Sequence, residues 1–316
     1  MHNASHGGVI TTVTLNPAID QAMSIDEIAV GRINRCRLDA LDPGGKGLNA
    51  SRVIRRLGRT TLALGFLGGV TGAMIRTRLD AEDVPHDFDE VPEMTRINVM
   101  VWERSAGRRT RLYPPGAAVD PEKLGLLRER LARVPPGGIV ILAGSVPPGL
   151  GQDVYRDLVG WLHPRGVRAF VDASGSALGA ALEARPALIK PNLAEAAEVL
   201  GRELRTEEDV VSGALELRER GADTVVISRG PAGAIAVDGS GRWRVTGPRV
   251  APRSAVGSGD SMVAGLAIEL NEGRGLADGL RLGAAAGAAT AIVPGTELCH
   301  PADVRRLFEE VAVRSI

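Results

Sequence analysis

The sequence predicts an α/β protein built on a parallel β-sheet with helices on both faces. Short runs rich in β-branched residues alternate with stretches of helical spacing, and these runs are apolar throughout rather than at every second position. Strands of that kind are buried on both faces, which is typical of parallel sheets covered by helices. The expected strands lie at residues 9–15, 137–145, 168–174, 187–192 and 223–230.

The stretches between these strands predict amphipathic helices. Residues 48–58 place aliphatic side chains on one face and arginines on the other, and we expect those arginines, Arg52 among them, to be solvated. Residues 121–134 and 207–221 show similar spacing, and residues 261–270 do so after a glycine-rich turn. Strands that alternate with such helices indicate an αβα sandwich.

Two segments interrupt the alternation on either side of an early glycine-rich stretch. Residues 21–42 and 94–115 resemble strands and hairpins and contain few helix formers. They could pair into a small sheet that serves as a lid over a site or as a contact between subunits, or they could be edge hairpins without such a role. We therefore expect a disordered polar lead at residues 1–8 and one domain at 9–316 with both lid segments inserted.

Composition excludes several classes of partner. The 38 basic and 38 acidic residues leave a formal net charge of zero, so nothing in the overall charge attracts nucleic acid or an acidic membrane. The most apolar late segment, residues 282–293, is well short of the ~20 residues of a membrane span. Two cysteines are too few for a disulfide framework, which favours a reducing, cytoplasmic location.

A carboxylate and two glycines precede the last of these helices, in residues 255–265. Gly257 and Gly259 allow backbone N–H groups to face a phosphate, which the helix dipole also favours. Asp260 could act beside that anion site or could simply cap the helix. A Rossmann fingerprint would need glycine where Met262 stands, and no Gly-Lys pair is followed by Ser or Thr as in a Walker A loop.

The early glycine-rich stretch follows the same physical logic. Gly45 and its neighbouring glycines expose backbone to a polar ligand, Lys46 offers a point charge, and Asn49 opens the following helix. Asp20 is expected to end a strand, at the edge where open α/β sheets bind ligands. Its carboxylate could bind sugar hydroxyls, or it could form a turn after Asn-Pro.

Two later strand ends also carry polar side chains. Lys190, Asn192 and Glu195 occupy the junction between a strand and a helix. Asn192 and Glu195 could together order a hydrated Mg²⁺, or they could form a helix cap with an acid in the first turn. The next strand end provides one hydroxyl and two glycines, at Ser228, Gly230 and Gly233.

Taken together, seven segments resemble the PfkB family of carbohydrate kinases, in its phosphofructokinase and tagatose-6-phosphate kinase branch. In chain order they are TLNPAID, GGKGLNASRVIRRLG, TRINV, GSVPPG, KPNLAEA, SRGPAGA and VGSGDSMVAG. The resemblance extends from about residue 9 through the rest of the chain. It implies a ribokinase-like αβα sandwich with a small β-sheet lid, which in this family often joins two subunits, so we expect a homodimer.

The resemblance also implies a sugar-phosphate substrate, ATP as donor and Mg²⁺ as helper. By motif position, Asp260 would be the catalytic base, with the N–H groups of Gly257, Ser258 and Gly259 as its anion hole. Phosphoryl transfer to an alcohol needs mainly positioning and charge stabilisation, which these groups could provide.

The remaining site residues are assigned by the same resemblance. Asn192 and Glu195 would order Mg²⁺ through water, in the family's manner. The nucleotide would contact Lys190, Asn192, Ser228, Gly230, Gly233, Gly257 and Gly259. The sugar would contact Asp20, Gly45, Asn49 and Ser145.

The phosphate already on the sugar requires cations, and the candidates are Lys46, Arg96 and one of Arg32 or Arg35. GGKG and TRINV are similar to 1-phosphofructokinases, and GGKG also to tagatose-6-phosphate kinases, whereas PPGAAV and GTELC resemble minor-type 6-phosphofructokinases. We expect phosphorylation of fructose 1-phosphate, with the other two activities as alternatives. A non-catalytic sugar-phosphate sensor is the alternative of another class, and the presence of Asp260 argues against it.

Overall fold

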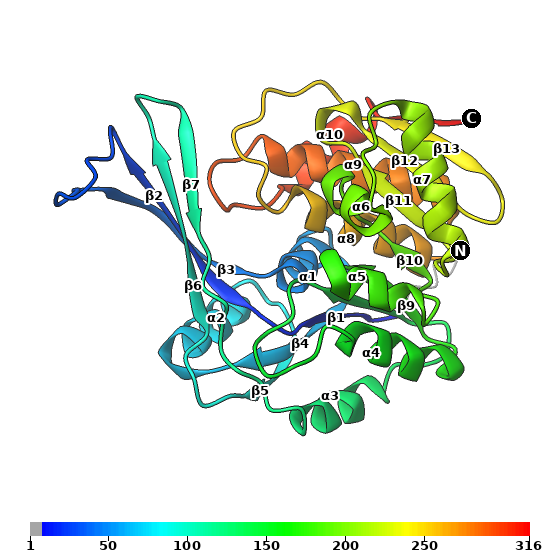
Figure 1. The fold of residues 1–316 in the computed structure, drawn as a ribbon, viewed down its shortest axis with the longest axis horizontal. Coiled ribbons are helices and arrows are strands. Elements are labelled where there is room, and N and C mark those ends of the chain that lie inside the picture. Colours follow the sequence, from blue (N-terminus) through cyan, green and yellow to red (C-terminus); the bar gives the residue numbers. More distant parts are fainter. Residues whose placement is uncertain (1–7) are drawn as a thin grey trace, which may run out of the picture.

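A large twisted sheet forms the centre of the computed structural model, which describes residues 8–316 (Figure 1). Within those residues the sheet has ten strands in the order β14-β13-β12-β11-β10-β9-β8-β1-β4-β5. Its parallel strands are β1 (Ile10–Thr14), β4 (Thr61–Leu67), β5 (His86–Glu90), β8 (Ile139–Ala143), β9 (Arg168–Asp172), β10 (Leu188–Ile189) and β11 (Val225–Ser228). All five strands expected from the sequence are present.

The other end of the sheet is antiparallel, a feature that was not predicted from the sequence. The added strands are β12 (Ala234–Val237), β13 (Arg242–Thr246) and β14 (Ala312–Ser315). Antiparallel neighbours can be joined by a short turn, so β11, β12 and β13 follow one another without an intervening α-helix. The alternation that indicates a parallel sheet therefore cannot reveal them.

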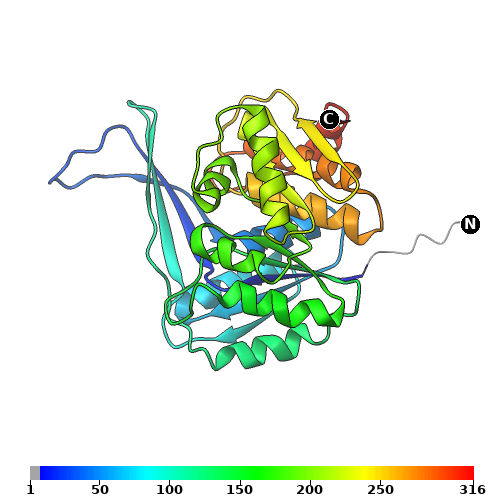
Figure 2. The ribbon, with the colours of Figure 1, turned by 45° about the vertical axis from the view of Figure 1, so that its right-hand side comes forward.

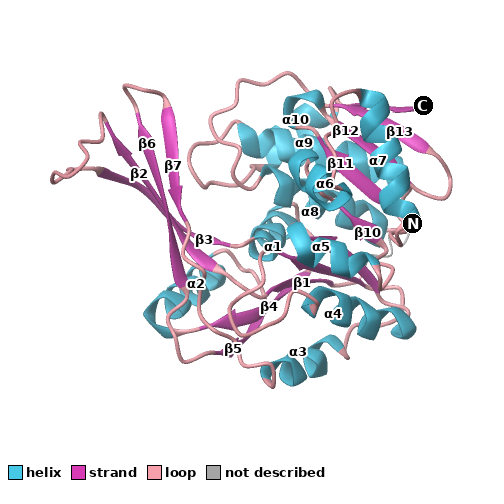
Figure 3. Cartoon of the chain, viewed as in Figure 1, coloured by secondary structure: helices cyan, strands magenta, loops and turns pink. Residues whose placement is uncertain are grey.

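Helices cover both faces of the sheet (Figure 3). One layer contains α1 (Lys46–Arg56), α8 (Ser258–Asn271), α9 (Leu276–Ala291) and α10 (Pro301–Phe308). The other contains α3 (Lys123–Leu131), α4 (Val154–Leu162), α5 (Gly175–Leu182), α6 (Leu193–Leu200) and α7 (Glu207–Glu219). Helix α2 (Gly69–Ala81) packs in a third cluster beside β4 and β5. Short 3₁₀ turns occur at η1 (His163–Arg165) and η2 (Gly230–Ala232).

Strand β8 shows why its sequence is apolar throughout. Ile139 and Ile141 pack into the cluster formed with α8 and α9, whereas Val140 and Leu142 pack into the cluster formed with α4 and α5. Successive side chains of a strand point to opposite faces, so burial on both faces removes the polar positions. The predicted αβα sandwich is thus present.

One helical prediction was wrong in detail. Arg52 on α1 is only 2% exposed, not solvated. Its guanidinium donates hydrogen bonds to the Glu82 carboxylate and to the Pro43 carbonyl oxygen. A buried guanidinium is tolerated when its donors are satisfied in this way. The sequence spacing places Arg52 on the polar face of α1, but Glu82 at the C-terminal end of α2 and Pro43 in the strand before α1 cover that part of the face.

A separate four-stranded sheet extends from one side of the main body, as Figure 2 shows. Its order is β3-β2-β6-β7, and its strands are β2 (Ala18–Ile25), β3 (Arg37–Gly44), β6 (Arg96–Glu103) and β7 (Arg108–Leu112). The segments at residues 21–42 and 94–115 both contribute to it, so the small sheet expected from the sequence is present. We refer to these four strands and their connecting loops as the small sheet.

Two further expectations concern the ends and the environment of the chain. Residues 1–7 of the expected disordered lead lie outside the described residues. Within residues 8–316, no helix combines the length and apolar character that a membrane span requires. Cys36 is exposed and Cys299 is buried, and neither forms a disulfide.

Candidate active site

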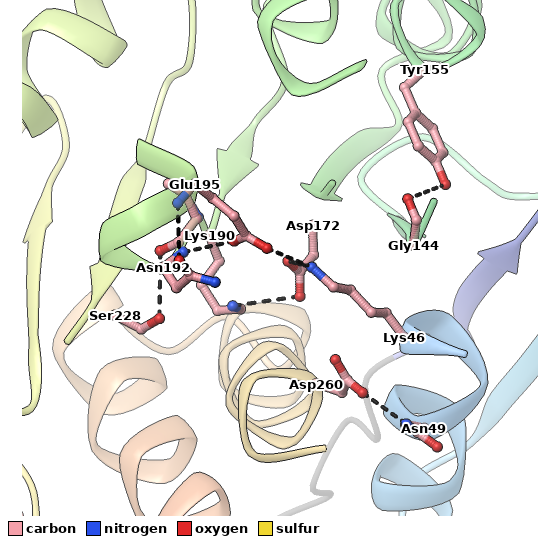
Figure 4. Close-up of polar contacts among 11 residues, drawn as sticks. Lys46, Asn49, Gly144, Tyr155, Asp172, Lys190, Asn192, Glu195, Ser228 and Asp260 are labelled. Atoms are coloured by element: carbon pink, nitrogen blue, oxygen red, sulfur yellow. Dashed lines mark hydrogen bonds and ion pairs between the residues drawn. The ribbon is translucent and has the colours of Figure 1, made fainter. Parts of the chain in front are cut away.

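Polar side chains gather where the parallel strands of the main sheet end. Asp172 ends β9, Lys190 follows β10, and Ser228 ends β11. The N-termini of α1, α6 and α8 approach the same edge, and Figure 4 shows their side chains pointing toward one another. The carboxyl ends of parallel strands are the usual ligand-binding edge of an open α/β sheet.

Asp260 lies in the first turn of α8 and is 7% exposed. Its Oδ2 accepts a hydrogen bond of 2.8 Å from Nδ2 of Asn49 on α1. Burial, together with the negative charge of Asp172, raises the pKa of Asp260 to about 6, against the opposing effects of Lys46, Asn49 and Lys190. A carboxylate with that pKa is ionised at neutral pH yet basic enough to accept a proton.

The turn before Asp260 presents free backbone donors. Gly257 has a φ of +78°, and a Cβ there would lie 2.6 Å from Leu298 Cδ2, so only glycine fits. The first N–H groups of α8 have no partner within the helix. The hydroxyl of Ser258 is buried without a hydrogen-bond partner, and a Cβ on Gly259 would lie 3.3 Å from Lys190 Nζ. Free N–H groups, an unpaired hydroxyl and an ammonium group therefore converge on one small region.

A second buried carboxylate lies between two lysines. Asp172 is 2% exposed, and its two oxygens contact Lys46 Nζ at 3.0 Å and Lys190 Nζ at 3.5 Å. Burial alone would raise the pKa of Asp172, but the two ammonium groups outweigh it and hold the pKa below its usual range. Likewise, burial would lower the pKa of Lys46, but Asp172, Glu195 and Asp260 together raise it. Lys46 and Asp172 therefore both remain ionised near neutral pH.

Asn192 and Glu195 form a reciprocal helix cap at the start of α6. Asn192 Oδ1 accepts from Glu195 N at 3.0 Å, and Glu195 Oε2 accepts from Asn192 N at 2.8 Å. The second carboxylate oxygen, Oε1, contacts Lys46 Nζ at 3.2 Å. The cap that the sequence left open as an alternative is thus present, and it leaves one oxygen of Glu195 facing the site.

The donor set around Lys46 fits a magnesium ion that is held mainly by a nucleotide. Glu195 and Asp172 direct carboxylate oxygens toward the same ammonium group, so they converge on one place. Within residues 8–316 there is no cluster of three or more His, Cys, Asp and Glu side chains suited to a metal. Mg²⁺ commonly binds through one or two carboxylates together with water and substrate phosphates, without a cage made of protein alone.

The candidate sugar-binding residues lie at the base of the small sheet. Asp20 on β2 is buried and accepts a hydrogen bond of 2.8 Å from Asn98 Nδ2 on β6. A Cβ on Gly44, next to Gly45, would overlap the Asp20 carboxylate, so glycine is required there. Burial raises the pKa of Asp20, although Asn98 and the nearby guanidinium of Arg96 oppose the rise. Asp20 is therefore a buried acceptor close to the start of α1.

Arg96 and Ser145 meet beside the loop that follows β1. The Arg96 guanidinium donates to Asn16 O at 2.9 Å, to Pro114 O at 2.9 Å and to Ser145 Oγ at 3.2 Å. Asn16 Nδ2 also donates to Ser145 Oγ, at 3.2 Å. Nε of Arg96 is buried without a partner. This cluster is a positively charged region at the edge between the main sheet and the small sheet.

The candidate nucleotide loop follows β11. Ser228 N donates to Pro191 O at 3.0 Å, which joins this loop to the strand end that carries Lys190. Gly230 faces open space, whereas the backbone of Gly233 packs against Val245 of β13. The structure therefore brings Ser228 next to Asn192, and Gly233 serves the packing of the antiparallel strands.

Two predicted substrate residues do not reach these strand ends within the chain. Arg32 and Arg35 are exposed in the loop between β2 and β3, at the outer end of the small sheet (Figures 1 and 2). Strands β2 and β6 run outward from the site and β3 and β7 return toward it, so the loop that joins β2 to β3 lies at the far end of the small sheet from the site (Figure 1). Of the four cations proposed for a substrate phosphate, Lys46 and Arg96 are the two near the strand ends.

Several residues of the site were not predicted from the sequence. Asp172 forms an ion pair with the predicted Lys46, and Asn98 donates a hydrogen bond to the predicted Asp20. Tyr155 is buried, and its hydroxyl donates to Gly144 O at 3.1 Å. Asp172 ends an apolar strand, which is the signal that selected Asp20, so the sequence could have revealed it. Asn98 lies within the TRINV segment. Tyr155 lies inside a helix, where no sequence signal distinguishes it from a core residue.

Comparisons with known proteins identify the family of the chain. The sequence profile described as pfkB family carbohydrate kinase matches residues 13–303. The chain is 36% identical to ATP-dependent 6-phosphofructokinase isozyme 2 of Escherichia coli (strain K12) over 301 residues, 95% of this chain and 97% of the relative. It is 35% identical to 1-phosphofructokinase of Bacillus subtilis (strain 168) over 305 residues, 96% and 99% of the two chains. A crystal structure of phosphofructokinase-2 from Escherichia coli in complex with potassium is similar, with a TM-score of 0.91 and 36% identity over 96% of this chain and 98% of that one.

Proposed function

Because the chain belongs to the pfkB family of carbohydrate kinases, we propose that it phosphorylates fructose 1-phosphate to fructose 1,6-bisphosphate. The ribokinase-like fold is confirmed, and the chain is a phosphotransferase that acts on an alcohol group of a sugar phosphate with ATP as co-substrate. The alternative acceptors are fructose 6-phosphate and tagatose 6-phosphate. One observation carries the proposed chemistry: a buried carboxylate, Asp260, lies beside a turn of free N–H groups.

In the proposed mechanism Asp260 is the general base. Asn49 holds its Oδ2, which leaves Oδ1 to accept the proton of the attacking sugar hydroxyl. The raised pKa supports this role, because proton transfer is most effective when the pKa of the base lies near the working pH. Asp20, buried beside Gly45, would accept hydrogen bonds from other sugar hydroxyls and fix the reacting one in place.

The groups around the α8 turn would offset charge on the transferring phosphoryl group. The N–H groups of Gly257, Ser258 and Gly259 would donate hydrogen bonds to its oxygens, and Lys190 would add a positive charge beside them. A Mg²⁺ ion would supply further neutralisation when bound, held through water by Asn192 and Glu195. The loop with Ser228 and Gly230 would contact the nucleotide.

The preference for fructose 1-phosphate rests on Lys46 and Arg96. Arg96 lies beside Ser145 with one buried nitrogen unpaired, which supports a role in binding the substrate phosphate. Lys46 in the sequence GGKG supports the 1-phosphofructokinase assignment, but its ammonium group now contacts Asp172 and Glu195. It can contact a phosphate only after it leaves at least one of these carboxylates. The similarity to the Escherichia coli 6-phosphofructokinase isozyme 2 favours fructose 6-phosphate as the second candidate.

A homodimer formed through the small sheet is part of the proposal, with the small sheet as a lid over the site. Its outer loop exposes Val30 at 92% and Ile33 at 93%, and Leu38, Trp102 and Leu112 are also exposed. Exposed apolar side chains gathered on one element commonly mark an interface. The related phosphofructokinase-2 of Escherichia coli has been solved in a tetrameric inhibited form. Arg32 and Arg35 lie on the same loop, so such an interface would move them from solvent to a subunit contact.

A cytoplasmic location completes the proposal. Cys36 and Cys299 are both free, and Cys36 is exposed. An exposed free thiol is compatible with a reducing compartment, where thiols are kept reduced.

The decisive experiment offers three acceptors to the purified protein in parallel. Fructose 1-phosphate, fructose 6-phosphate and tagatose 6-phosphate are supplied with ATP and Mg²⁺, and kcat/KM is measured from ADP release for each. We expect the highest value for fructose 1-phosphate. A higher value for either other sugar would replace the substrate assignment. Sugar-phosphate and ATP binding without turnover of any acceptor would instead indicate a non-catalytic sensor.

A further inference from the structure

Lys46 connects the two halves of the site. It is the first residue of α1, directly after the sugar-side Gly45, yet its ammonium group lies between Asp172 of β9 and Glu195 of α6 (Figure 4). The two N–O distances are 3.0 and 3.2 Å. A cation from the sugar side therefore occupies the place where two carboxylates of the nucleotide side converge.

The choice of lysine at this place is informative. Lys and Arg total 38 residues, only three of them lysine, and two of these three contact Asp172. An ammonium group is a compact, strongly hydrated point charge, whereas a guanidinium is a broad planar fork. A compact cation between two carboxylates is the arrangement that a small divalent ion would otherwise adopt.

We propose that Lys46 competes with the divalent cation for Asp172 and Glu195. In the free protein the ammonium group neutralises both carboxylates, so a metal ion without nucleotide binds weakly. When the metal arrives bound to the nucleotide phosphates, its greater charge displaces the ammonium group, and Lys46 becomes free on the sugar side. Lys46 would thereby make metal entry depend on the nucleotide. This inference rests on the proposed role of Glu195 in ordering the metal.

The charges around Lys46 are consistent with displacement. Asp172 keeps Lys190 as a second partner at 3.5 Å, so it stays paired with a cation when Lys46 leaves. Glu195 remains fixed by its cap with Asn192, so its Oε1 keeps its position without Lys46. Side-chain exposure of Lys46 is 33%, which leaves room for the group to move. Removal of Lys46 should therefore expose a formed pair of oxygens and leave the fold intact.

The test measures Mn²⁺ binding to the protein without nucleotide. Mn²⁺ stands in for Mg²⁺ because its paramagnetism allows free and bound ion to be distinguished by electron paramagnetic resonance. Lys46→Met should bind Mn²⁺ about tenfold more tightly than the unaltered protein, on the order expected when one opposing charge is removed at close range. Lys46→Arg, which keeps the charge, should not tighten binding. Lys123→Met on α3 is the matched control for the loss of a lysine, and it should leave the dissociation constant unchanged.

A second substitution distinguishes the proposed competition by Lys46 from the proposed metal role of Glu195. Glu195→Gln, introduced into the Lys46→Met protein, should weaken Mn²⁺ binding again. If Glu195→Gln weakens binding but Lys46→Met does not tighten it, competition by Lys46 is wrong and the proposed metal role of Glu195 stands. If Glu195→Gln has no effect on the tightened binding, the metal assignment in the proposed function is wrong. Circular dichroism of each variant verifies its fold, and Lys46→Gln replaces Lys46→Met should that protein fail to fold.

Discussion

Asp172 and Asp260 are two buried carboxylates at one edge of the main sheet, and their surroundings shift their pKa values in opposite directions. Asp172 lies between two ammonium groups, and its pKa is lowered. Asp260 has one neutral hydrogen-bond partner, Asn49, and its pKa is raised to about 6. Burial raises the pKa of both, so the difference comes from the neighbouring charges: two ammonium groups contact Asp172, whereas the negative charge of Asp172 raises the pKa of Asp260 further.

This difference assigns different tasks to the same chemical group. A carboxylate that is ionised at every pH of interest can hold cations in place, but it cannot readily accept a proton. A carboxylate with a pKa near neutrality is a useful base, yet its charge destabilises the fold. We therefore expect Asp172 to support stability and the position of the lysines, and Asp260 to support turnover.

The largest expected effect is the loss of turnover in Asp260→Ala. If Asp260 is the general base, kcat should fall by about 10²- to 10⁴-fold, the contribution that such a base makes. ATP affinity should change little, because the turn of free N–H groups is formed by the backbone. Steady-state kinetics and calorimetric titration with ATP measure the two quantities. Near-normal turnover would show that Asp260 is not the general base.

The second effect is a loss of stability in Asp172→Asn. The substitution leaves Lys190, which is almost fully buried, without its carboxylate partner. Breaking a buried ion pair on one side costs about 3 kcal/mol in the free energy of unfolding. Urea unfolding at pH 7.5 measures this value, with exposed Asp153→Asn on the surface before α4 as the control.

The pH dependence of that loss follows from the lowered pKa of Asp172. The unfolded state binds more protons than the folded state as pH falls, so the stabilisation is present above the normal pKa of an aspartate and is lost as pH falls through the lowered one. The difference in the free energy of unfolding between the unaltered protein and Asp172→Asn should therefore decrease as the pH is lowered. A gap that is absent at pH 7.5 would show that the two lysines do not need this carboxylate.

The third effect has the opposite sign. Asp260→Asn should raise the free energy of unfolding by about 1 to 3 kcal/mol at pH 8, because a pKa shift of one unit corresponds to about 1.4 kcal/mol. The folded pKa of Asp260 is raised, so the folded state binds more protons between pH ~4 and ~6, and stability decreases as pH rises through that window. Removing the charge restores this stability.

Urea unfolding of Asp260→Asn and the unaltered protein at pH 8 and pH 5 tests this sign. The gain should be smaller at pH 5, where Asp260 in the unaltered protein is largely protonated. Equal free energies of unfolding at pH 8 would mean that the ionised Asp260 carboxylate does not destabilise the fold. The proposed difference between Asp260 and Asp172 would then be wrong.

Sequence reasoning succeeded where the relevant signal is local. Each useful pattern spans about a dozen residues: a continuous apolar strand, an amphipathic helix or a glycine at a helix start. These patterns predict the sandwich, the small sheet and the turn before Asp260. The family resemblance added the chain-wide order of these segments. Asp260 and Asn49 were both predicted, although the hydrogen bond between them joins residues 211 positions apart.

The sequence did not predict the burial or the partners of a side chain where these depend on other elements that pack against it. Arg52 has the spacing of a solvated face, but Glu82 and the Pro43 carbonyl enclose its guanidinium. Lys46 has the position of a phosphate ligand, but Asp172, 126 residues away, holds its ammonium group. Arg32 lies on a loop whose distance from the site depends on the direction of the small sheet. Such contacts depend on how elements pack, which no local pattern encodes.

The smallest expected effect concerns the acid limb of the pH–rate profile. With Asp260 as base and a pKa of about 6, kcat should fall about tenfold per unit below pH 6 and level off above pH 7. The phosphate of a sugar substrate also titrates near pH 6, so the limb by itself does not identify the group. Asn49 supplies the means of distinguishing them, because its hydrogen bond lowers the pKa of Asp260 but does not alter that of free substrate.

Asn49→Ala should therefore move the acid limb of kcat to higher pH, by roughly half a unit to one unit, the size expected when one hydrogen bond to a charged group is lost. Profiles of kcat at saturating substrate isolate the ionisation in the complex. Asn98→Ala is the matched control, because Asn98 donates a similar bond to Asp20 rather than to Asp260. A limb that stays in place in Asn49→Ala would belong to the substrate, and the raised pKa of Asp260 would then have no part in turnover.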